Sequence, residues 1–358
     1  MGIRALLAGS ALLMAGVVAC SSAGVATASA SAADTSRTAK IATSGAATAT
    51  VAGARAATAG SAASATVTDG LCTAPAAHRA LAAQLSADIW KGLRGRSGYH
   101  GVSVYDRVTG VYCVYNGPKH FDSASIVKAI ILAALLRWHQ QTGKPLSAWE
   151  KSEAALMITQ SDNDAATALW NELGLGNLQH FLNLAGMGET QLGQDGEWGL
   201  TQVTAHDEMM LLKLLTARNS VLDAYSRSYQ LGLMAHVVNW ESWGVTAGTP
   251  SGVTRHVKNG WLPDATGWHI DSIGTFSGHG KDYMIVVLSD NTDMDDDEQY
   301  GISTIEDVAR LVQRDLNNAK LTGSSTASAR LAVAANVAQP HARLSSAVVP
   351  ALPTPARG

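Results

Sequence analysis

The chain has 358 residues and a formal net charge of −3 at pH 7. This slightly acidic balance, without any run of Lys or Arg, excludes a basic surface for nucleic acid and a charge-driven contact with an anionic membrane. Aromatic side chains, which dominate core burial, begin at Trp90 and end at Tyr300. Outside that span Ala, Ser, Thr, Gly and Val predominate, so the sequence predicts one folded domain at 71–318.

The N-terminal segment 1–20 has the pattern of an export signal. An Arg is followed by an apolar run that is too short to span a bilayer, and then by small residues. Two cleavage sites compete. Val17-Val18-Ala19-Cys20 resembles a bacterial lipobox, in which Cys20 would carry a lipid anchor on the outer face of the cell membrane. Alternatively, Ala28-Ser29-Ala30 fits an ordinary signal peptidase and a fully secreted protein.

Two segments flank the domain and have low complexity. Residues 21–70 form an Ala/Ser/Thr-rich linker, and residues 319–358 form an Ala-rich tail. Both are expected to be disordered because they contain little apolar bulk.

Two cysteines, Cys72 and Cys113, fall within the domain. An exported protein meets an oxidising compartment, which favours one disulfide that ties the start of the first helix to an early strand. Two buried free thiols are the alternative.

Hydrophobic periodicity predicts the elements in chain order. A helix at 74–93 is followed by a β-hairpin at 99–117 with its turn at Thr109-Gly110, and by an apolar helix at 121–143 that ends near Gly143. Further helices are expected at 151–173, 178–185 and 204–216, strands at 254–262, 268–278 and 283–291, and a last helix at 303–318. Strands joined by hairpins indicate an antiparallel sheet covered by helices, which is an α+β fold.

The first candidate for chemistry is Ser125, which forms an S-x-x-K motif with Lys128. Three residues apart on a helix, the two side chains share one face, and a lysine with a depressed pKa can take the serine proton. About one such motif is expected by chance in a chain of this composition. The position at the start of an apolar helix, with Asp122 or Ser123 as N-cap, favours a functional hydroxyl. Alternatively, Ser125 is itself a cap and Lys128 a surface residue.

Two further motifs follow in order, Ser161-Asp162-Asn163 and Lys258-Asn259-Gly260. Ser161 and Asn163, two positions apart, can offer a hydroxyl for proton transfer and an amide for holding a substrate. A lysine on a strand supplies a fixed positive charge, and a glycine lets the backbone approach a reacting carbonyl. A second Ser-Asp-Asn at 289–291 is expected to be a turn.

The ordered set S-x-x-K, S-D-N and K-x-G resembles the serine β-lactamases and penicillin-binding proteins. The stretch MITQSDNDAATALWNELGLGNLQHFLNLAGM is similar to class A β-lactamases, and the resemblance covers roughly 75–318. It implies a five-stranded antiparallel sheet packed by helices, plus an all-helical subdomain with the active site between them. It also implies Ser125 as acylated nucleophile, Lys128 as base, Ser161 as proton relay, Asn163 as substrate anchor, Lys258 as electrostatic partner, and the N–H groups of Ser125 and Trp261 as oxyanion hole.

The sequence departs from class A enzymes at three points. In class A enzymes the glutamate that activates the deacylating water lies in an E-x-x-L-N pattern. Here the preferred candidate is Glu197, in the run Glu197-Trp198-Gly199-Leu200-Thr201, rather than Glu189. Alternatively, Glu197 is an ordinary surface glutamate. Asn259 stands where the family has a hydroxyl that donates to the substrate carboxylate, and an amide can also donate. Ser125 and Ser161 are only 36 positions apart, which predicts a trimmed helical subdomain and an open cleft.

No motif indicates a cofactor or a metal. The histidines lack zinc spacing, and the acidic run Asp290–Glu298 lacks the central glycine of a calcium loop. The sequence thus favours an exported monomeric hydrolase acting on a small β-lactam or peptidoglycan-like acyl substrate, with a role in antibiotic resistance. The alternatives are a D,D-peptidase or esterase of the same fold, and a non-catalytic cell-wall-binding lipoprotein.

Overall fold

The computed structural model describes residues 66–292 and 298–319. The expected signal segment, Cys20, both cleavage sites, nearly all of the linker and all but the first residue of the tail lie outside the described residues. Within the described part, no helix is both long enough and apolar enough to cross a membrane.

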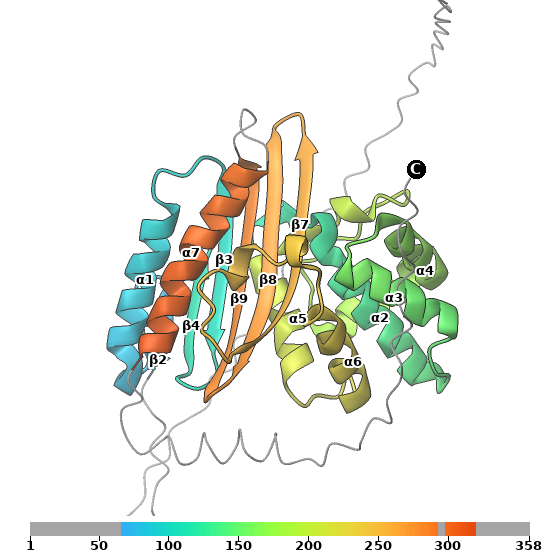
Figure 1. The fold of residues 1–358 in the computed structure, drawn as a ribbon, viewed down its shortest axis with the longest axis horizontal. Coiled ribbons are helices and arrows are strands. Elements are labelled where there is room, and N and C mark those ends of the chain that lie inside the picture. Colours follow the sequence, from blue (N-terminus) through green and yellow to red (C-terminus); the bar gives the residue numbers. More distant parts are fainter. Residues whose placement is uncertain (1–65, 293–297, 320–358) are drawn as a thin grey trace, which may run out of the picture. The chain divides into compact units, whose positions relative to one another are not determined.

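The centre of the fold is a seven-stranded antiparallel sheet, in the order β1-β2-β4-β3-β9-β8-β7 (Figure 1). Its strands are β1 (Thr66–Asp69), β2 (Cys72–Pro75), β3 (Tyr99–Asp106), β4 (Val111–Tyr115), β7 (Thr254–Asp264), β8 (Gly267–Gly278) and β9 (Lys281–Thr292). A separate two-stranded sheet pairs β5 (His120–Asp122) with β6 (Gln202–Thr204).

Seven α-helices accompany the sheet in the described residues. They are α1 (Arg79–Leu93), α2 (Val127–Thr142), α3 (Ala148–Thr159), α4 (Asn163–Ala185), α5 (Ala205–Thr216), α6 (Ala224–Met234) and α7 (Gln299–Asn318). Short 3₁₀ turns lie at η1 (Ala76–His78), η2 (Ala124–Ile126), η3 (Trp198–Leu200), η4 (Asn239–Glu241) and η5 (Gly244–Thr246).

Two apolar cores lie on opposite faces of the sheet. Along β9, Met284, Val286 and Leu288 join the core made with α2–α6, whereas Ile285 and Val287 join the core made with α1 and α7. This alternation follows from the two-residue period of a strand. Figure 1 shows α1 and α7 side by side over one face and the α2–α6 block on the other.

The predicted α+β class is confirmed, but the strand count and several boundaries were wrong. The sheet has seven strands rather than five, because β1 and β2 extend it at one edge. β1 begins at Thr66, inside the segment expected to be a disordered linker, and its Val67 pairs with Ala74. Helix α6 was missed, and the helix expected at 151–173 is instead broken at 160–162.

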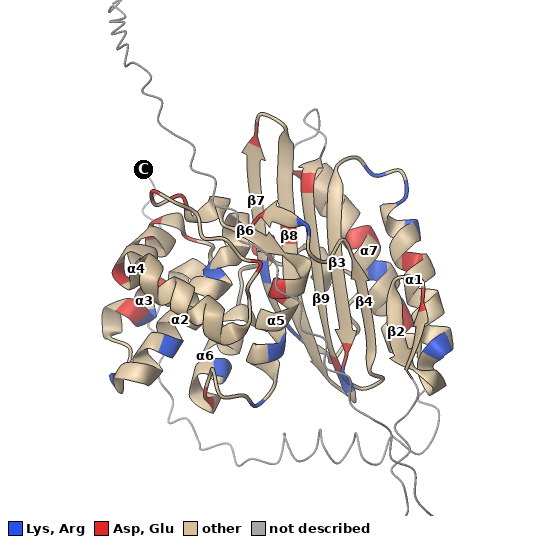
Figure 2. Cartoon of the chain, turned by 180° about the vertical axis from the view of Figure 1, so that it is seen from behind, with Lys and Arg blue, Asp and Glu red and all other residues tan. Residues whose placement is uncertain are grey.

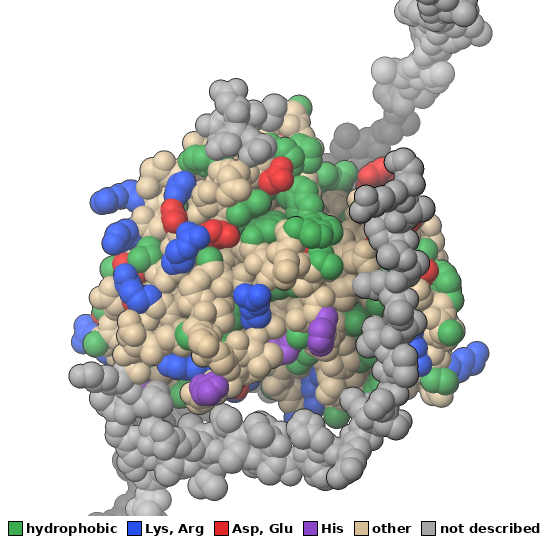
Figure 3. All heavy atoms as spheres, in the orientation of Figure 1, with side chains coloured by type: hydrophobic (Ala, Val, Ile, Leu, Met, Phe, Trp, Pro, Cys, Tyr) green, Lys and Arg blue, Asp and Glu red, His purple; other side chains and the backbone are tan. Residues whose placement is uncertain are grey.

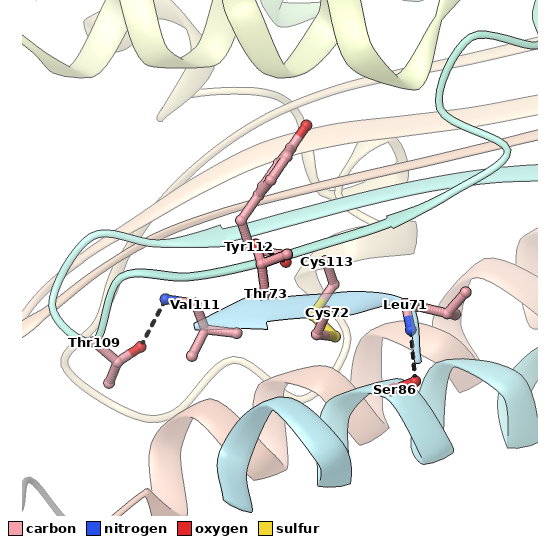
Figure 4. Close-up of a disulfide and its surroundings, with 8 residues drawn as sticks. All are labelled: Leu71, Cys72, Thr73, Ser86, Thr109, Val111, Tyr112 and Cys113. Atoms are coloured by element: carbon pink, nitrogen blue, oxygen red, sulfur yellow. Dashed lines mark hydrogen bonds between the residues drawn. A yellow bond between two sulfur atoms is a disulfide. The ribbon is translucent and has the colours of Figure 1, made fainter. Parts of the chain in front are cut away.

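The disulfide between Cys72 and Cys113 is present and joins β2 to β4 (Figure 4). The two cysteines are direct partners in the antiparallel register, and both are fully buried. The bridge therefore fastens a peripheral strand to the sheet, on the side that lies away from β7.

Charges of both signs are interspersed on the surface. Figures 2 and 3 show Lys and Arg scattered among Asp and Glu on opposite sides of the described domain, with no continuous basic band. This agrees with the small formal net charge of −3.

Candidate active site

Ser125 lies in the 3₁₀ turn η2, directly before helix α2. Asp122 belongs to β5, and neither it nor Ser123 caps the helix with its side chain, so the expected N-cap is absent. The preceding Ala124 has φ +43°, a left-handed conformation that costs a non-glycine residue about 1–3 kcal/mol. Strained backbone of this kind is held only where the surrounding structure imposes it, and it clusters at functional sites.

Lys128 is completely buried in the first turn of α2. Its Nζ donates to the carbonyl oxygen of Ser161 at 2.5 Å, to Ser161 Oγ at 3.3 Å and to Asn163 Oδ1 at 2.7 Å. Burial, and then the nearby positive charge of Lys258, lower the pKa of Lys128 to about 7. A large fraction of this lysine is therefore uncharged at neutral pH, as a base for the Ser125 proton must be.

Ser161 lies in the break between α3 and α4 and also has a left-handed backbone, with φ +57°. Lys258 on β7 is 1% exposed, and its Nζ donates to Ser161 Oγ at 2.8 Å. Burial lowers the pKa of Lys258 to about 8. The hydroxyl of Ser161 thus contacts both Lys128 and Lys258, which are 130 positions apart in the sequence.

Gly260 brings the strand into contact with the nucleophile turn. A Cβ at this position would lie 2.7 Å from Ser125 N and 2.9 Å from Ser123 O, which no real side chain tolerates. β7 is also the edge strand of the sheet, so N–H groups along its outer edge have no strand partner. Gly260, the residue before Trp261, is therefore the point at which β7 approaches the backbone of Ser125.

The expectation for Asn259 does not fit the structure. Its side chain is 1% exposed, and its amide donates to the carbonyl oxygens of Glu241 at 2.7 Å and Trp243 at 3.2 Å. Its Oδ1 accepts from Ser272 Oγ at 2.6 Å. Successive side chains on a strand point to opposite faces. Lys258 faces the site, so the side chain of the next residue, Asn259, points into the protein, where its hydrogen bonds connect η4 to β7.

Glu197 precedes η3 in a loop that is tied to the nucleophile turn, since Ser123 N donates to Thr201 O at 2.9 Å. The Glu197 side chain is exposed and makes no hydrogen bond or ion pair within the described residues. The next residue, Trp198, places its ring 4.8 Å from Lys128 Nζ. The competing Glu189 is engaged elsewhere, because its Oε2 accepts from Thr204 Oγ1 at 2.9 Å.

Sequence reasoning missed Glu241, which lies on η4 beside this group. It is 2% exposed, and neither of its carboxylate oxygens has a hydrogen-bond partner in the described part of the chain. Its charge raises the pKa of Lys128 and of Lys258, while burial raises the pKa of Glu241 itself. No motif marks this residue; a buried carboxylate near two lysines becomes visible only in three dimensions.

Comparisons with known proteins identify a family and several solved structures of similar fold. A model of the β-lactamase enzyme family matches residues 138–316. Among solved structures, a variant of the class A β-lactamase of the last common ancestor of Gram-negative bacteria is 21% identical, with a TM-score of 0.57, over 66% of this chain and 100% of that chain. A β-lactamase from Xanthomonas campestris pv. campestris is 18% identical, with a TM-score of 0.57, over 66% of this chain and 99% of that chain.

A class A representative from Bacteroides cellulosilyticus is 15% identical, with a TM-score of 0.57, over 66% of this chain and 98% of that chain. At these identities the likeness shows the fold. A search among curated proteins found no match.

Proposed function

The chain belongs to the β-lactamase enzyme family, whose model spans half of it, and from that premise we propose that it is an exported serine hydrolase acylated at Ser125. The family match and the class A-like fold support a hydrolase of the class A β-lactamase type. In the proposed reaction a β-lactam or a related amide transfers its acyl group to Ser125, and water then releases it. The observation that carries this proposal is the buried Lys128–Ser161–Lys258 hydrogen-bond group beside the strained Ser125 turn.

Acylation would proceed through the side chains of this group. Neutral Lys128 takes the proton from Ser125 Oγ as that oxygen bonds to the carbonyl carbon of the amide. The C–N bond then breaks, and the leaving nitrogen receives the hydroxyl proton of Ser161. Protonated Lys128 restores that proton, because its Nζ already donates toward Ser161 Oγ. The cycle ends with an acyl ester on Ser125, a protonated leaving nitrogen and neutral Lys128.

The remaining roles concern charge and orientation. The N–H groups of Ser125 and Trp261 would stabilise the developing oxyanion, and Gly260 is what allows the two backbone segments to meet. Asn163 fixes Lys128 through its Oδ1, and its amide nitrogen remains for the substrate, since it makes no hydrogen bond within the described residues. Lys258 would attract the substrate carboxylate, a role that Asn259 does not share.

Deacylation would be assigned to Glu197, which must activate a water molecule. Its loop is tied to the nucleophile turn through Ser123, but its carboxylate is exposed and has no hydrogen-bond or ion-pair partner among residues 66–292 and 298–319. This observation favours a second candidate function, a D,D-peptidase or esterase of the same fold that forms a long-lived acyl-enzyme with β-lactams. Deacylation rate is thus what separates the two candidates.

The proposed function is tested by the hydrolysis of a chromogenic cephalosporin. Wild type should turn over the substrate, Ser125→Ala should lose activity by several orders of magnitude, and Ser228→Ala, an exposed serine on α6, should behave as wild type. Equal rates for wild type and Ser125→Ala would reject the proposal. Absence of both hydrolysis and any acyl adduct with penicillin would support the third candidate, a non-catalytic cell-wall-binding lipoprotein.

The role of Glu197 has its own test. Glu197→Gln should accumulate the penicilloyl-enzyme by slowing deacylation, while the rate of acylation stays unchanged. Glu189→Gln serves as the matched control, because its carboxylate contacts Thr204 and His206. Equal deacylation rates in wild type and Glu197→Gln would remove Glu197 from the mechanism and favour the second candidate.

Export and anchoring are part of the same proposal. The N-terminal apolar run followed by Cys20 supports a lipid-anchored protein on the outer face of a bacterial membrane. Cys20→Ala should move the protein from the membrane fraction to the medium, and retention of the variant in the membrane would contradict the anchor.

A further inference from the structure

The ring of Trp198 covers Lys128 on the side of the loop that carries Glu197. Lys128 Nζ lies 4.8 Å from the centre of the indole, and its hydrogen bonds go to Ser161 and Asn163. Lys128 is 0% exposed, whereas Trp198 is half-buried and packs against the core made with α2–α6. The indole is therefore one wall between the proposed base and solvent.

The loop that carries Trp198 is closed at its ends. Two backbone hydrogen bonds join Gln191 and Gln202, with N–O distances of 2.9 and 2.8 Å. Inside the loop, Gly193 N donates to Thr201 Oγ1 at 3.1 Å, and Thr201 N donates to Trp198 O at 3.1 Å. Since the carbonyl of Thr201 also accepts from the nucleophile turn, these bonds fix the backbone of Trp198 relative to that turn.

A side-chain hydrogen bond fixes the ring itself. Trp198 Nε1 donates to Thr167 Oγ1 at 3.0 Å. Thr167 lies four positions after Asn163 on α4, so the two side chains are neighbours on one face of that helix. Asn163 accepts from Lys128 Nζ and Thr167 accepts from the indole. One helix face thus places both the lysine and the ring that covers it.

The indole has two effects of opposite sign on the charge of Lys128. Its ring face attracts a cation, which favours the protonated amine. It also keeps water away, which disfavours the protonated amine because a charged group loses its hydration. Burial is the largest cause that lowers the pKa of Lys128 to about 7, so we expect the exclusion of water to outweigh the attraction of the ring.

Charged groups on other elements also act on this lysine. Lys258 on β7 lowers its pKa, whereas Glu241 on η4 and Asp162, the N-cap of α4, raise it. The acidic side chains on the loop of Trp198 are exposed: Asp195 and Glu197. Replacement of Trp198 leaves all these charges in the chain, so a changed titration of the lysine reports the loss of its cover.

We propose that Trp198 is a positioning residue for acylation, whose ring excludes water from Lys128 Nζ and so keeps this amine available as a neutral base. The inference rests on the proposed acylation at Ser125, in which Lys128 takes the serine proton. Without the indole, water reaches Nζ and hydrates the ammonium form. Fewer molecules then hold a lysine that can accept a proton at neutral pH.

The test is the titration of Lys128, followed by NMR in the full chain with ¹³C-labelled lysine and assigned with Lys128→Arg. Trp198→Ala should raise the midpoint by about one pH unit, which reduces the neutral fraction at pH 7 roughly fivefold. The rate constant for acylation by penicillin at pH 7 should fall by the same factor, and the rise of its pH profile should move to higher pH. Trp198→Phe, which keeps a ring in place, should bring both midpoints back toward wild type.

Two further variants make the result specific. Thr167→Val removes only the acceptor of the indole N–H, at an exposed position, and should raise the midpoint less than Trp198→Ala does. Trp149→Ala, at a residue of α3 that is 47% exposed, is the matched control and should titrate as wild type does.

An unchanged or lowered midpoint in a folded Trp198→Ala would overturn the proposal, and a lowered one would mean that the ring chiefly attracts the ammonium. The same midpoint for Trp149→Ala as for Trp198→Ala would also overturn it. Failure of wild type to react with penicillin would reject the proposed function alone, because the titration of Lys128 is measured without penicillin.

Discussion

Substitution of Gly260 by alanine displaces the nucleophile without touching any catalytic side chain. The new Cβ would lie 2.7 Å from Ser125 N and 2.9 Å from Ile126 N, against about 3.4 Å for ordinary contact. Since these neighbours are backbone atoms, the turn and β7 must separate by about 0.7 Å. Overpacking of this kind costs about 1–3 kcal/mol of stability. A 1 Å displacement of reacting groups costs about 10²-fold in rate, so a displacement of about 0.7 Å should slow acylation by roughly 25-fold.

The assay is the second-order rate constant for acylation by penicillin, measured by intact mass, alongside the thermal midpoint. Gly232→Ala is the matched control, because it lies in α6 with ordinary φ and with no atom within 4 Å of the new Cβ. That variant should acylate as wild type does and gain up to about 1 kcal/mol in stability. If a folded Gly260→Ala is acylated at the wild-type rate, the close approach of β7 to Ser125 is not required for the reaction.

Three further predictions concern the pH profile, Glu241 and the disulfide. The acylation rate should rise with a midpoint near pH 7, as Lys128 loses its proton, and fall above about pH 8, as Lys258 loses its charge. The Glu241 carboxylate raises the pKa of both lysines, so Glu241→Gln should move both the rise and the fall of the acylation rate to lower pH. Unchanged midpoints would show that Glu241 does not act on the lysines. Replacing Cys72 and Cys113 by alanine opens a loop with a sequence separation of 41 and should cost about 4 kcal/mol in urea unfolding, without loss of acylation per folded molecule. An unchanged urea midpoint would contradict this estimate.

The fold class could be predicted because hairpins and helices have strong local signals. The 99–117 hairpin and the end of α2 at Gly143, which has φ +68°, were placed correctly. The two outer strands were not, because β1 and β2 are four-residue segments whose pairing depends on the rest of the sheet. The break at Ser161 was missed for a related reason, since the helical pattern continues through it and tertiary contacts impose the left-handed backbone.

The site could be predicted only where motifs carry it. Ser125, Lys128, Ser161 and Lys258 were identified from their order, and the contacts of both lysines with Ser161 are consistent with the roles proposed for them. The direction of a side chain is not encoded in a motif, so the inward orientation of Asn259 was missed. Glu241 was missed because it becomes a neighbour of Lys128 and Lys258 only through the fold.

Intact mass spectrometry after mixing with penicillin, followed by peptide mapping, tests the central claim most directly. A mass increase equal to one penicillin, located on the peptide that contains Ser125 and absent in Ser125→Ala, is the predicted result. Decay of the adduct within minutes would indicate hydrolysis, and persistence for hours a penicillin-binding enzyme. Two results would contradict acylation at Ser125. One is that wild type forms no adduct at any time and does not hydrolyse penicillin; the other is that the adduct lies on another residue.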